Sequence, residues 1–247
     1  MSFWSQIDGS VYNAIGVLIG GSLGLLFRHA LPPRVSQTVQ SAIGLTTIFL
    51  AVRIAWQLGD INAGSIPGIV IALIALAIGG GIGEALRLDE RLGGIAQRFQ
   101  TQSGQTNDPR FSEGLLAAFL IFCVGPVTIL GSIDNGLRGD NQLLIVKTVL
   151  DTITSAALAS SYGIGVLFSA IPLLLGQGAI SVAAGAFAQY IPDAAQNPYV
   201  LVATSTGGII LIGLGLNLLD VTKLRIAALL PGLLLAPALL WCALLFA

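Results

Sequence analysis

The sequence predicts an all-α protein that crosses a membrane about eight times, and three observations support this fold class. Hydrophobic residues make up 55% of the 247 residues and charged residues only 9%, whereas about a quarter of a soluble domain is charged. The mean hydropathy is +0.88. The apolar residues also form continuous runs of about 20, the length that crosses about 30 Å of hydrocarbon as a helix. The chain is therefore predicted to be a multi-pass membrane protein in contact with the lipid bilayer.

Eight spans are predicted, one from each apolar run. They are residues 11–31, 35–57, 66–86, 113–132, 142–160, 166–191, 200–219 and 226–246. The fifth and sixth spans share one apolar stretch, divided at the Ser- and Gly-rich residues 160–165, so a seven-span alternative stays open. The polar segment 87–110 begins with apolar residues at helical spacing. It is predicted to start as an amphipathic helix on the cytoplasmic interface and to end as a loop.

The second half of the chain repeats the first at an offset of 164 residues. Residues 41–76 align without a gap on residues 205–240, with nine of 36 positions identical. The identical positions include a Pro-Gly pair that occurs once in each repeat. The first three-span unit would enter the membrane from one face and the last three-span unit from the other. The repeats 11–86 and 166–246 would therefore have inverted topology. Two linker spans within 113–160 would separate them, giving a single 3+2+3 membrane domain over residues 1–247. The alternative is a chance alignment of segments rich in small and aliphatic residues.

The positions of the basic residues predict the orientation. Eight of the eleven Lys and Arg residues fall in or beside the loops after spans one, three and seven, and Arg53, Arg138 and Lys147 fall near the opposite face. Basic residues favour the cytoplasmic side, so both termini are expected outside. The three Trp residues near the outer interface agree with this. The first ten residues carry no Lys or Arg, so no secretory signal is expected and the first span should be retained.

The fifth span is the most polar helix of the chain. Thr148, Asp151, Thr152 and Ser155 follow at intervals of three and four residues, so they share one helix face. A carboxylate at that depth costs about 3 kcal/mol, and Asp151 must therefore be paired, protonated or hydrated. One hypothesis is a structural bridge to Lys147, and another is a coupling carboxylate that faces a cavity. Lys147 could instead extend to the lipid headgroups.

Span four contains Gly125-Pro126, where the helix is predicted to kink or break. Pro126 has no N–H and crowds the carbonyl of Phe122. The break could expose carbonyl groups that coordinate an ion at membrane depth. Alternatively, it is a kink that serves only the packing of the helices.

Polar and small residues in other spans give further candidates. The offset of 164 aligns Asn13 with Gln177 and Arg53 with Asn217. Such residues either hold helices together by hydrogen bonds or build a shared binding site from both repeats. In span one, glycines four residues apart form a face for close helix packing or for gliding; they are Gly16, Gly20 and Gly24.

Several function classes are not expected. Cys123 and Cys242 lie inside predicted spans without paired spacing, so neither a disulfide framework nor a metal site is predicted. The net charge of -1 argues against a nucleic-acid partner. No nucleophile and base can be assembled around the single histidine, His29, so no catalytic site and no cofactor are expected.

Several segments together resemble the YdfK/YqgA-like family of bacterial inner-membrane proteins, a family of unknown function. The segments that carry the resemblance are 13–24, 122–126, 131–137, 147–151, 163–172 and 177–178. At one position the chain differs, since Val127 stands where the family often has Met. The resemblance implies an integral protein of the bacterial inner membrane, loosely described as a transporter, without an assigned substrate or catalytic residue.

The leading hypothesis is a transporter or channel for an unidentified small solute or ion that binds near the midplane between the repeats. Asp151 would be the coupling residue, with Lys147 or Arg53 as its charge partner. One alternative is a membrane assembly or sensory protein that transports nothing. A lipid-modifying enzyme is less favoured, because Asp151 is the only deeply placed acid in the predicted spans. The sequence leaves open whether copies of the chain form a homo-oligomer.

Overall fold

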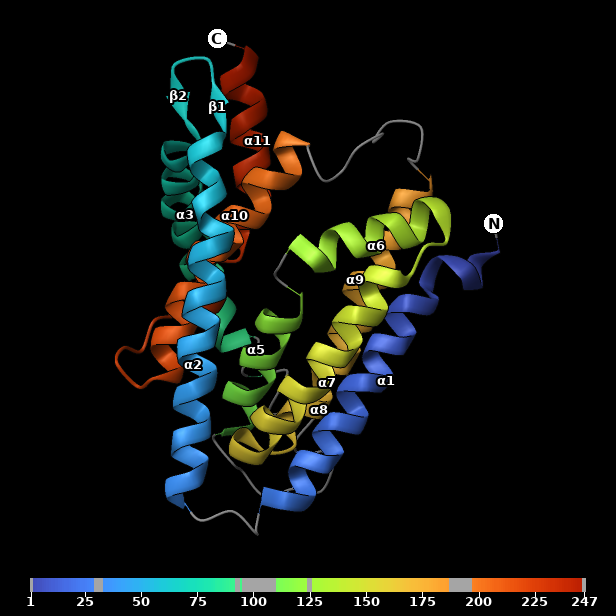
Figure 1. The fold of residues 1–247 in the computed structure, drawn as a ribbon. Helices are drawn as coiled ribbons and strands as arrows, with labels where there is room; N and C mark the ends of the chain where they lie inside the picture. The colour runs from blue at the N-terminus through green and yellow to red at the C-terminus, as the bar shows by residue number, and fades with distance from the viewer. Residues whose placement is uncertain are drawn as a thin grey trace. The chain divides into compact units, whose positions relative to one another are not determined.

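The protein is described by a computed structural model that covers residues 2–28, 33–91, 94, 110–123, 126–186 and 197–245. Nearly all of these residues are helical (Figure 1). Within the described ranges, seven helices are long and apolar enough to cross a membrane, or eight if one bent pair is counted as a span. The predicted all-α, multi-pass membrane fold is therefore confirmed. The bent pair lies in predicted span four, whereas the seven-span alternative from the sequence fuses the fifth and sixth spans, which are separate helices here.

The chain divides into two compact units, and each contains helices from both halves of the sequence. The first unit comprises residues 1–43 and 95–192, and the second comprises residues 44–94 and 193–247. The helices of the first unit are α1 (Phe3–Arg28), α5 (Arg110–Cys123), α6 (Pro126–Arg138), α7 (Gln142–Tyr162), α8 (Gly165–Phe168) and α9 (Ala170–Ala186). The helix α2 (Pro33–Trp56) contains the division between the units.

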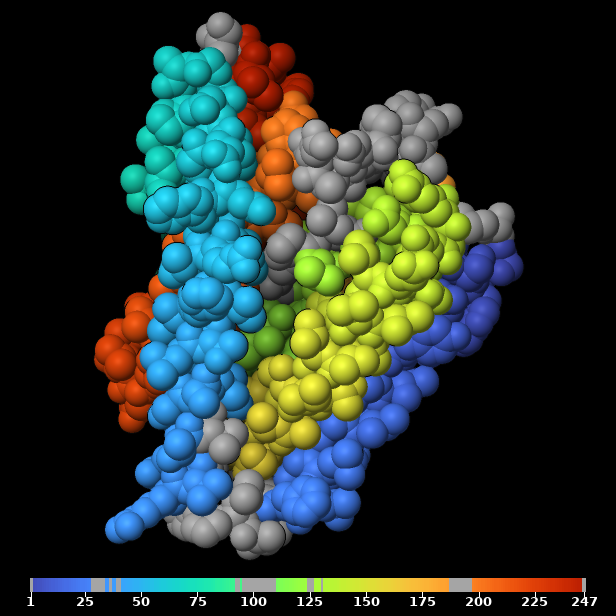
Figure 2. Space-filling view, viewed as in Figure 1, coloured from blue at the N-terminus to red at the C-terminus, as the bar shows by residue number. Residues whose placement is uncertain are grey.

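In the first unit, α1 lies directly along α7 (Figures 1 and 2). The glycine face of α1 makes this contact. A Cβ atom added at Gly20 would lie 2.0 Å from the carbonyl oxygen of Thr152, and one added at Gly24 would lie 2.1 Å from that of Ala156. The two backbones thus touch where only glycine fits, as small residues permit in membranes. Because positions along both helices increase together, α1 and α7 run parallel.

The predicted break in span four is present. The helix α5 ends at Cys123, α6 begins at Pro126, and the two are bent by 69°. The carbonyl of Phe122 accepts a hydrogen bond from Thr128 Oγ1 at 2.9 Å. This bond supplies a partner for the carbonyl that the proline was expected to free. Gly125 lies outside the described residues.

After the break, α6 continues to Arg138. The expectation that span four ends at residue 132 is wrong. The reason lies in the faces of α6: Ser132 and Asn135, one turn apart, are both fully buried, so the helix continues because it packs against the unit. The predicted division between spans five and six is confirmed, since α7 ends at Tyr162 and Gly163 turns the chain with a φ of 81°, a conformation that glycine favours.

The second unit is a bundle of the part of α2 from Gly44 on with α3, α10 and α11 (Figure 1). Its elements after α2 are η1 (Gln57–Asp60), β1 (Asn62–Ala63), β2 (Ile66–Pro67), α3 (Gly68–Ala85), α10 (Pro198–Leu218), η3 (Ile226–Leu229) and α11 (Pro231–Leu245). The strands β1 and β2 form an antiparallel hairpin. Both Pro-Gly pairs of the sequence repeat stand where a helix starts, in α3 and in α11. Proline suits this position because the first-turn N–H has no partner within the helix.

Small residues bring the helices of the second unit together. A Cβ atom at Gly83 would lie 1.9 Å from the carbonyl oxygen of Ala228, and one at Gly79 would lie 2.4 Å from the backbone nitrogen of Gly232. These contacts make α3 and α11 antiparallel. Around them lies an apolar core of fully or nearly fully buried residues: Leu58, Ile61, Ala63, Ile71, Ala72, Ala75, Val202, Ala236 and Leu240.

Most of the segment predicted as an amphipathic cytoplasmic helix, 87–110, lies outside the described residues. Its beginning is described, and residues 88–91 are helical. Asp89 accepts a hydrogen bond from the backbone N–H of Ala228 at 3.1 Å. Arg225 forms a salt bridge with Glu84 at 2.7 Å. These contacts hold the end of α3 against the turn before α11.

Candidate functional site

The helix α7 presents its charges inward and its aliphatic side chains outward. Val146, Val149, Leu150 and Ile153 are 57–64% exposed, and they follow at intervals of three, one and three residues on one face. The opposite face carries Lys147 and Asp151, which are each only 6% exposed. A helix in water has the reverse arrangement, whereas lipid favours an aliphatic exterior. The charged residues therefore lie inside the first unit.

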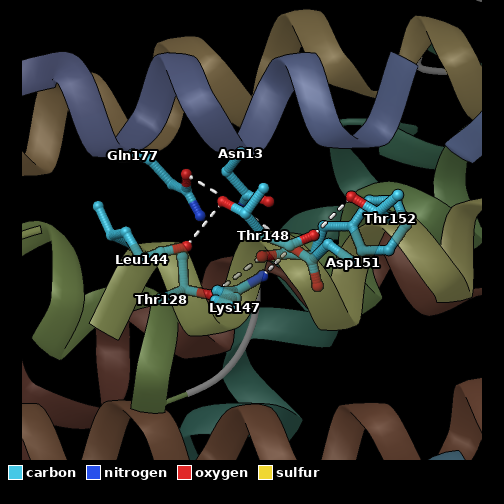
Figure 3. A network of polar contacts seen from close by, with 9 residues as sticks. Asn13, Thr128, Leu144, Lys147, Thr148, Asp151, Thr152 and Gln177 are labelled. Atoms are coloured by element: carbon cyan, nitrogen blue, oxygen red, sulfur yellow. Dashed lines mark hydrogen bonds and ion pairs between the residues drawn. The ribbon is translucent and has the colours of Figure 1, made fainter. Parts of the chain in front are cut away.

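Lys147 and Asp151 form a buried ion pair, in which Lys147 Nζ donates to Asp151 Oδ2 (Figure 3). The ammonium also lies 5.9 Å from the centre of the Phe122 ring, within the range of a cation–π contact. Of the alternatives for Lys147, the structure shows the bridge to Asp151 and not an extension toward the lipid headgroups. Asp151 lies one residue from the middle of α7.

Two amide side chains extend the ion pair toward α1 and α9. Asn13 Nδ2 donates to Asp151 Oδ2 at 3.0 Å and to Gln177 Oε1 at 3.3 Å. Asn13 is fully buried and Gln177 is 1% exposed. Gln177 lies one residue from the middle of α9. The four residues Asn13, Lys147, Asp151 and Gln177 are called the polar cluster below, and Figure 3 shows their side chains converging between the three helices.

The predicted hydroxyl residues of α7 lie beside the polar cluster. Thr148 Oγ1 donates to the carbonyl of Leu144 at 2.7 Å, and Thr152 Oγ1 donates to that of Thr148 at 2.6 Å. Both hydroxyls are thus bonded within their own helix. Ser155 is fully buried and donates to the carbonyl of Val17 in α1 at 2.7 Å. Its hydroxyl ties α7 to α1 one turn beyond Asp151.

Comparison with known proteins gives the family. The sequence profile described as "Protein of unknown function (DUF554)" matches residues 8–241. The chain belongs to the DUF554 family. It is 29% identical over 233 residues to "Uncharacterized membrane protein YdfK" of Bacillus subtilis (strain 168), covering 94% of this chain and 95% of that protein. It is 27% identical over 235 residues to "Uncharacterized protein YqgA" of Escherichia coli (strain K12), again covering 94% and 95%. No solved structure matches. The resemblance to YdfK/YqgA-like proteins is therefore confirmed.

The remaining predicted site residues of this DUF554 chain are distributed over both units. Pro126 begins α6 in the first unit. Arg53 is exposed on α2 in the second unit. Asn217 lies near the end of α10, where its Oδ1 accepts from the N–H of Leu224 at 2.9 Å and its Nδ2 donates to the carbonyl of Leu224 at 2.8 Å. Asn217 thus fixes the turn that follows α10.

Sequence reasoning missed the polar residues of α6 and the acid at the start of α1. Asn135 Nδ2 donates to Asp8 Oδ1 at 2.9 Å, and Asn141 Nδ2 donates to Asp8 Oδ2 at 2.9 Å. Thr128, Ser132 and Asn135 are all buried on α6 of this DUF554 chain. Their intervals of four and three residues were the available signal, but the prediction that span four ends at residue 132 concealed it.

Proposed function

We propose that the protein is an integral membrane transporter or channel for a small solute or ion, and that the polar cluster is its binding site. The observation that carries the proposal is the burial of Asp151 near the middle of the membrane-length helix α7, in an ion pair with the buried Lys147 one turn away. Charged residues inside membrane helices are costly, and they mark ion pathways and coupling sites. Stability alone does not account for the pair, because well-packed apolar residues often stabilise a protein as well as a buried ion pair does.

The contacts between helices related by the offset of 164 residues support the proposed inverted repeat and, with it, the location of the site. Helices related by the offset of 164 residues contact each other in antiparallel directions: α1 with α9, α2 with α10 and α3 with α11. Asn13 and Gln177 are themselves 164 residues apart and share a hydrogen bond. Transporters built from inverted repeats bind their substrates near the midplane, where the repeats meet.

The contacts between α2 and α10 are reciprocal, as a two-fold relation requires. A Cβ atom at Gly44 would lie 2.9 Å from Leu219, and one at Gly208 would lie 2.7 Å from Ala55. Gly208 is the repeat equivalent of Gly44, and Leu219 is that of Ala55. Gly44 therefore contacts the equivalent of Ala55, and Ala55 contacts the equivalent of Gly44. Such reciprocal contacts are the pattern of a two-fold interface.

The chemistry of the cluster suits a small charged or polar species. The carboxylate of Asp151 is neutralised by Lys147 and accepts a second bond from Asn13. A cation that enters competes with the Lys147 ammonium for this carboxylate, whereas an anion competes with the carboxylate for the ammonium. The amides of Asn13 and Gln177 bind either sign, because each has a donor and an acceptor. We assign the coupling role to Asp151.

The proposal includes the orientation and the membrane. The chain would lie in the bacterial inner membrane with both termini outside. The parallel run of α1 and α7, and the antiparallel run of α1 and α9, support the alternation of the spans. Reporter fusions at Gln102 and at the exposed Asp140 would report the sidedness, and we expect Gln102 in the cytoplasm and Asp140 outside. The opposite result at both sites would reverse the orientation.

Flux measurements in proteoliposomes test the function. Concentration jumps of H⁺, Na⁺, K⁺ and Cl⁻ on a solid-supported membrane, and uptake of small amines and carboxylates, would identify a transported species. We expect Asp151→Asn to lower that flux at least 10-fold and Asp151→Glu to retain part of it. The matched control is Glu84→Gln, which removes an exposed carboxylate of the second unit and should leave the flux unchanged. Full flux in a folded Asp151→Asn variant would remove Asp151 from the mechanism.

A further inference from the structure

Buried polar atoms without a hydrogen-bond partner gather in one part of the first unit. Among the described residues, seven buried side chains carry such an atom, and six of them lie on α1, α6 and α9. These six are Ser10, Asn13, Ser132, Asn135, Gln177 and Ser181, and each is at most 1% exposed. The seventh, Ser205, lies on α10 in the second unit. The concentration of six atoms on three helices needs a physical explanation.

The six side chains form a continuous seam because their helices contact one another and their spacing is helical. Ser10 and Asn13 are three residues apart on α1, Ser132 and Asn135 are three apart on α6, and Gln177 and Ser181 are four apart on α9. The three helices contact one another in pairs. Each residue is thus about one turn, about 5 Å, from the next on its helix. The six residues are called the polar seam below.

Close approaches fix how the helices meet along the polar seam. A Cβ atom at Gly136 would lie 1.9 Å from the carbonyl oxygen of Ser181, so α6 and α9 touch there. A Cβ atom at Gly9 would lie 3.1 Å from Asn135 Oδ1, which places this unpartnered oxygen beside α1. At the other end, Asn13 and Gln177 join the seam to Asp151.

The polar seam reaches the partly exposed Asp8 at one end, called its open end below, and apolar or already bonded groups at the other. At the start of α1, Asn135 Nδ2 bonds to Asp8, whose side chain is partly exposed. Beyond Asp151 the neighbouring groups are apolar or already bonded, since Ser155 donates to Val17, and Val17, Leu158 and Leu173 are fully buried. The seam therefore leads from the end of the unit where α1 begins to Asp151, and no further.

We infer that the polar seam holds a file of water molecules that admits small monovalent cations from the α1 N-terminal side to Asp151. Buried polar groups are almost always hydrogen-bonded, and ordered water is the usual partner when protein atoms do not provide one. Five of the six unpartnered atoms are oxygens, which are the ligands that cations prefer. The carboxylate of Asp8 at the open end attracts cations. The inference rests on the proposed function only in making Asp151 the destination.

Cysteine accessibility tests the water file. In a background without Cys123 and Cys242, Ser132→Cys and Ser181→Cys each replace a hydroxyl by a thiol of similar size. Ag⁺, a small monovalent cation, is added from one side of sealed vesicles, and unreacted thiols are then counted with a maleimide after denaturation. Two variants are matched controls: Ser155→Cys lies beyond Asp151, and Ser205→Cys replaces the buried unpartnered serine of the second unit.

We expect the two seam thiols to react at least 10-fold faster than both control thiols, and only when Ag⁺ is added on the side where α1 begins. Equal, slow reaction at all four positions would overturn the inference. Reaction from the opposite side alone would also overturn it, because the seam would then open at the wrong end. Fast reaction without any measurable ion flux would retain the water file and remove the proposed transport function.

Hydroxyl-radical footprinting of the unchanged protein provides a second measurement that does not depend on folding of the variants. Radicals made from bound water oxidise the side chains beside it. We expect oxidation of residues 128–137 to exceed that of residues 202–214, because the described side chains of both segments are buried or half-buried but the second segment belongs to the second unit. Equal protection of the two segments would contradict a water file.

Discussion

The two compact units satisfy their buried polar groups in different ways. In the second unit, Thr206 donates to the carbonyl of Val202 in its own helix at 2.7 Å, and Thr204 donates to that of Val200 at 3.0 Å. In the first unit, Asn13 bonds to residues of two other helices. The second unit is thus joined by glycine and aliphatic contacts, whereas the first contains polar groups that depend on their neighbours. Such groups either hold the helices of the first unit together by hydrogen bonds or serve the proposed binding site.

The largest expected effect comes from breaking the ion pair of the first unit. Lys147→Met leaves the Asp151 carboxylate buried without its counter-charge, and loss of one partner of a buried pair costs about 3–5 kcal/mol. The double variant Lys147→Met, Asp151→Leu removes both charges, and we expect it to return to within about 1 kcal/mol of the original stability. Thermal unfolding in detergent would measure both.

This pair of variants separates the two hypotheses for Asp151. A purely structural bridge predicts that the stable double variant keeps its flux, whereas a coupling carboxylate predicts a stable protein without flux. A double variant as unstable as the single one would contradict the comparison of the two units, because the charges would then be needed for folding itself.

The next effect is expected to be alike in both units, because both are joined at glycines. Gly24→Ala in the first unit places a Cβ 2.1 Å from a carbonyl oxygen, and Gly83→Ala in the second places one 1.9 Å away. Each helix pair must separate, at a cost of about 1–3 kcal/mol. The matched controls have open space: Gly178→Ala in α9 and Gly81→Ala in α3.

We expect the two control variants to be neutral or more stable by up to about 1 kcal/mol, since alanine favours a helix more than glycine does. The midpoint temperatures of thermal unfolding of the four variants measure these differences in stability. If Gly24→Ala were tolerated while Gly83→Ala was not, the contact between α1 and α7 would be adjustable, which would revive the gliding interpretation of the glycine face.

Much of the fold could be predicted from the sequence because the controlling signals are local. The spans follow from apolar runs of membrane length, and the break at Pro126 follows from its missing N–H. The end of α7 follows from Gly163, which adopts a positive φ. The extent of α6 could not be predicted in this way. Residues 134–138 have the composition of a turn, but Asn135 is buried against α1, where its Nδ2 donates to the carbonyl of Ser5, and this packing favours the helix.

Part of the candidate site could also be predicted, because the spacing of its residues is visible in the sequence. The interval of four residues between Lys147 and Asp151 is a local signal, and the offset of 164 related Asn13 to Gln177. That these two pairs meet depends on how α1, α7 and α9 pack, which no single helix encodes. The position of Lys147 shows this dependence, because its depth in the span allowed either a bridge or an extension to the headgroups. The choice is made by the Phe122 ring and Asp151 beside it.

The smallest expected effect concerns the amide pair that joins the repeat equivalents. Exchanging the two residues, Asn13→Gln with Gln177→Asn, preserves the combined length of the side chains across the contact between α1 and α9. Each single change lengthens or shortens that reach, and each should cost a few tenths of a kcal/mol up to about 1, because hydrogen bonds between membrane helices average about 0.6 kcal/mol. We expect the double variant to recover most of the loss in an unfolding double-mutant cycle. Thr206→Val is the reference from the second unit, since its hydroxyl bonds only within its own helix. Losses that simply add in the exchanged variant would mean that Asn13 and Gln177 act independently, and the repeat would then lose its clearest side-chain contact.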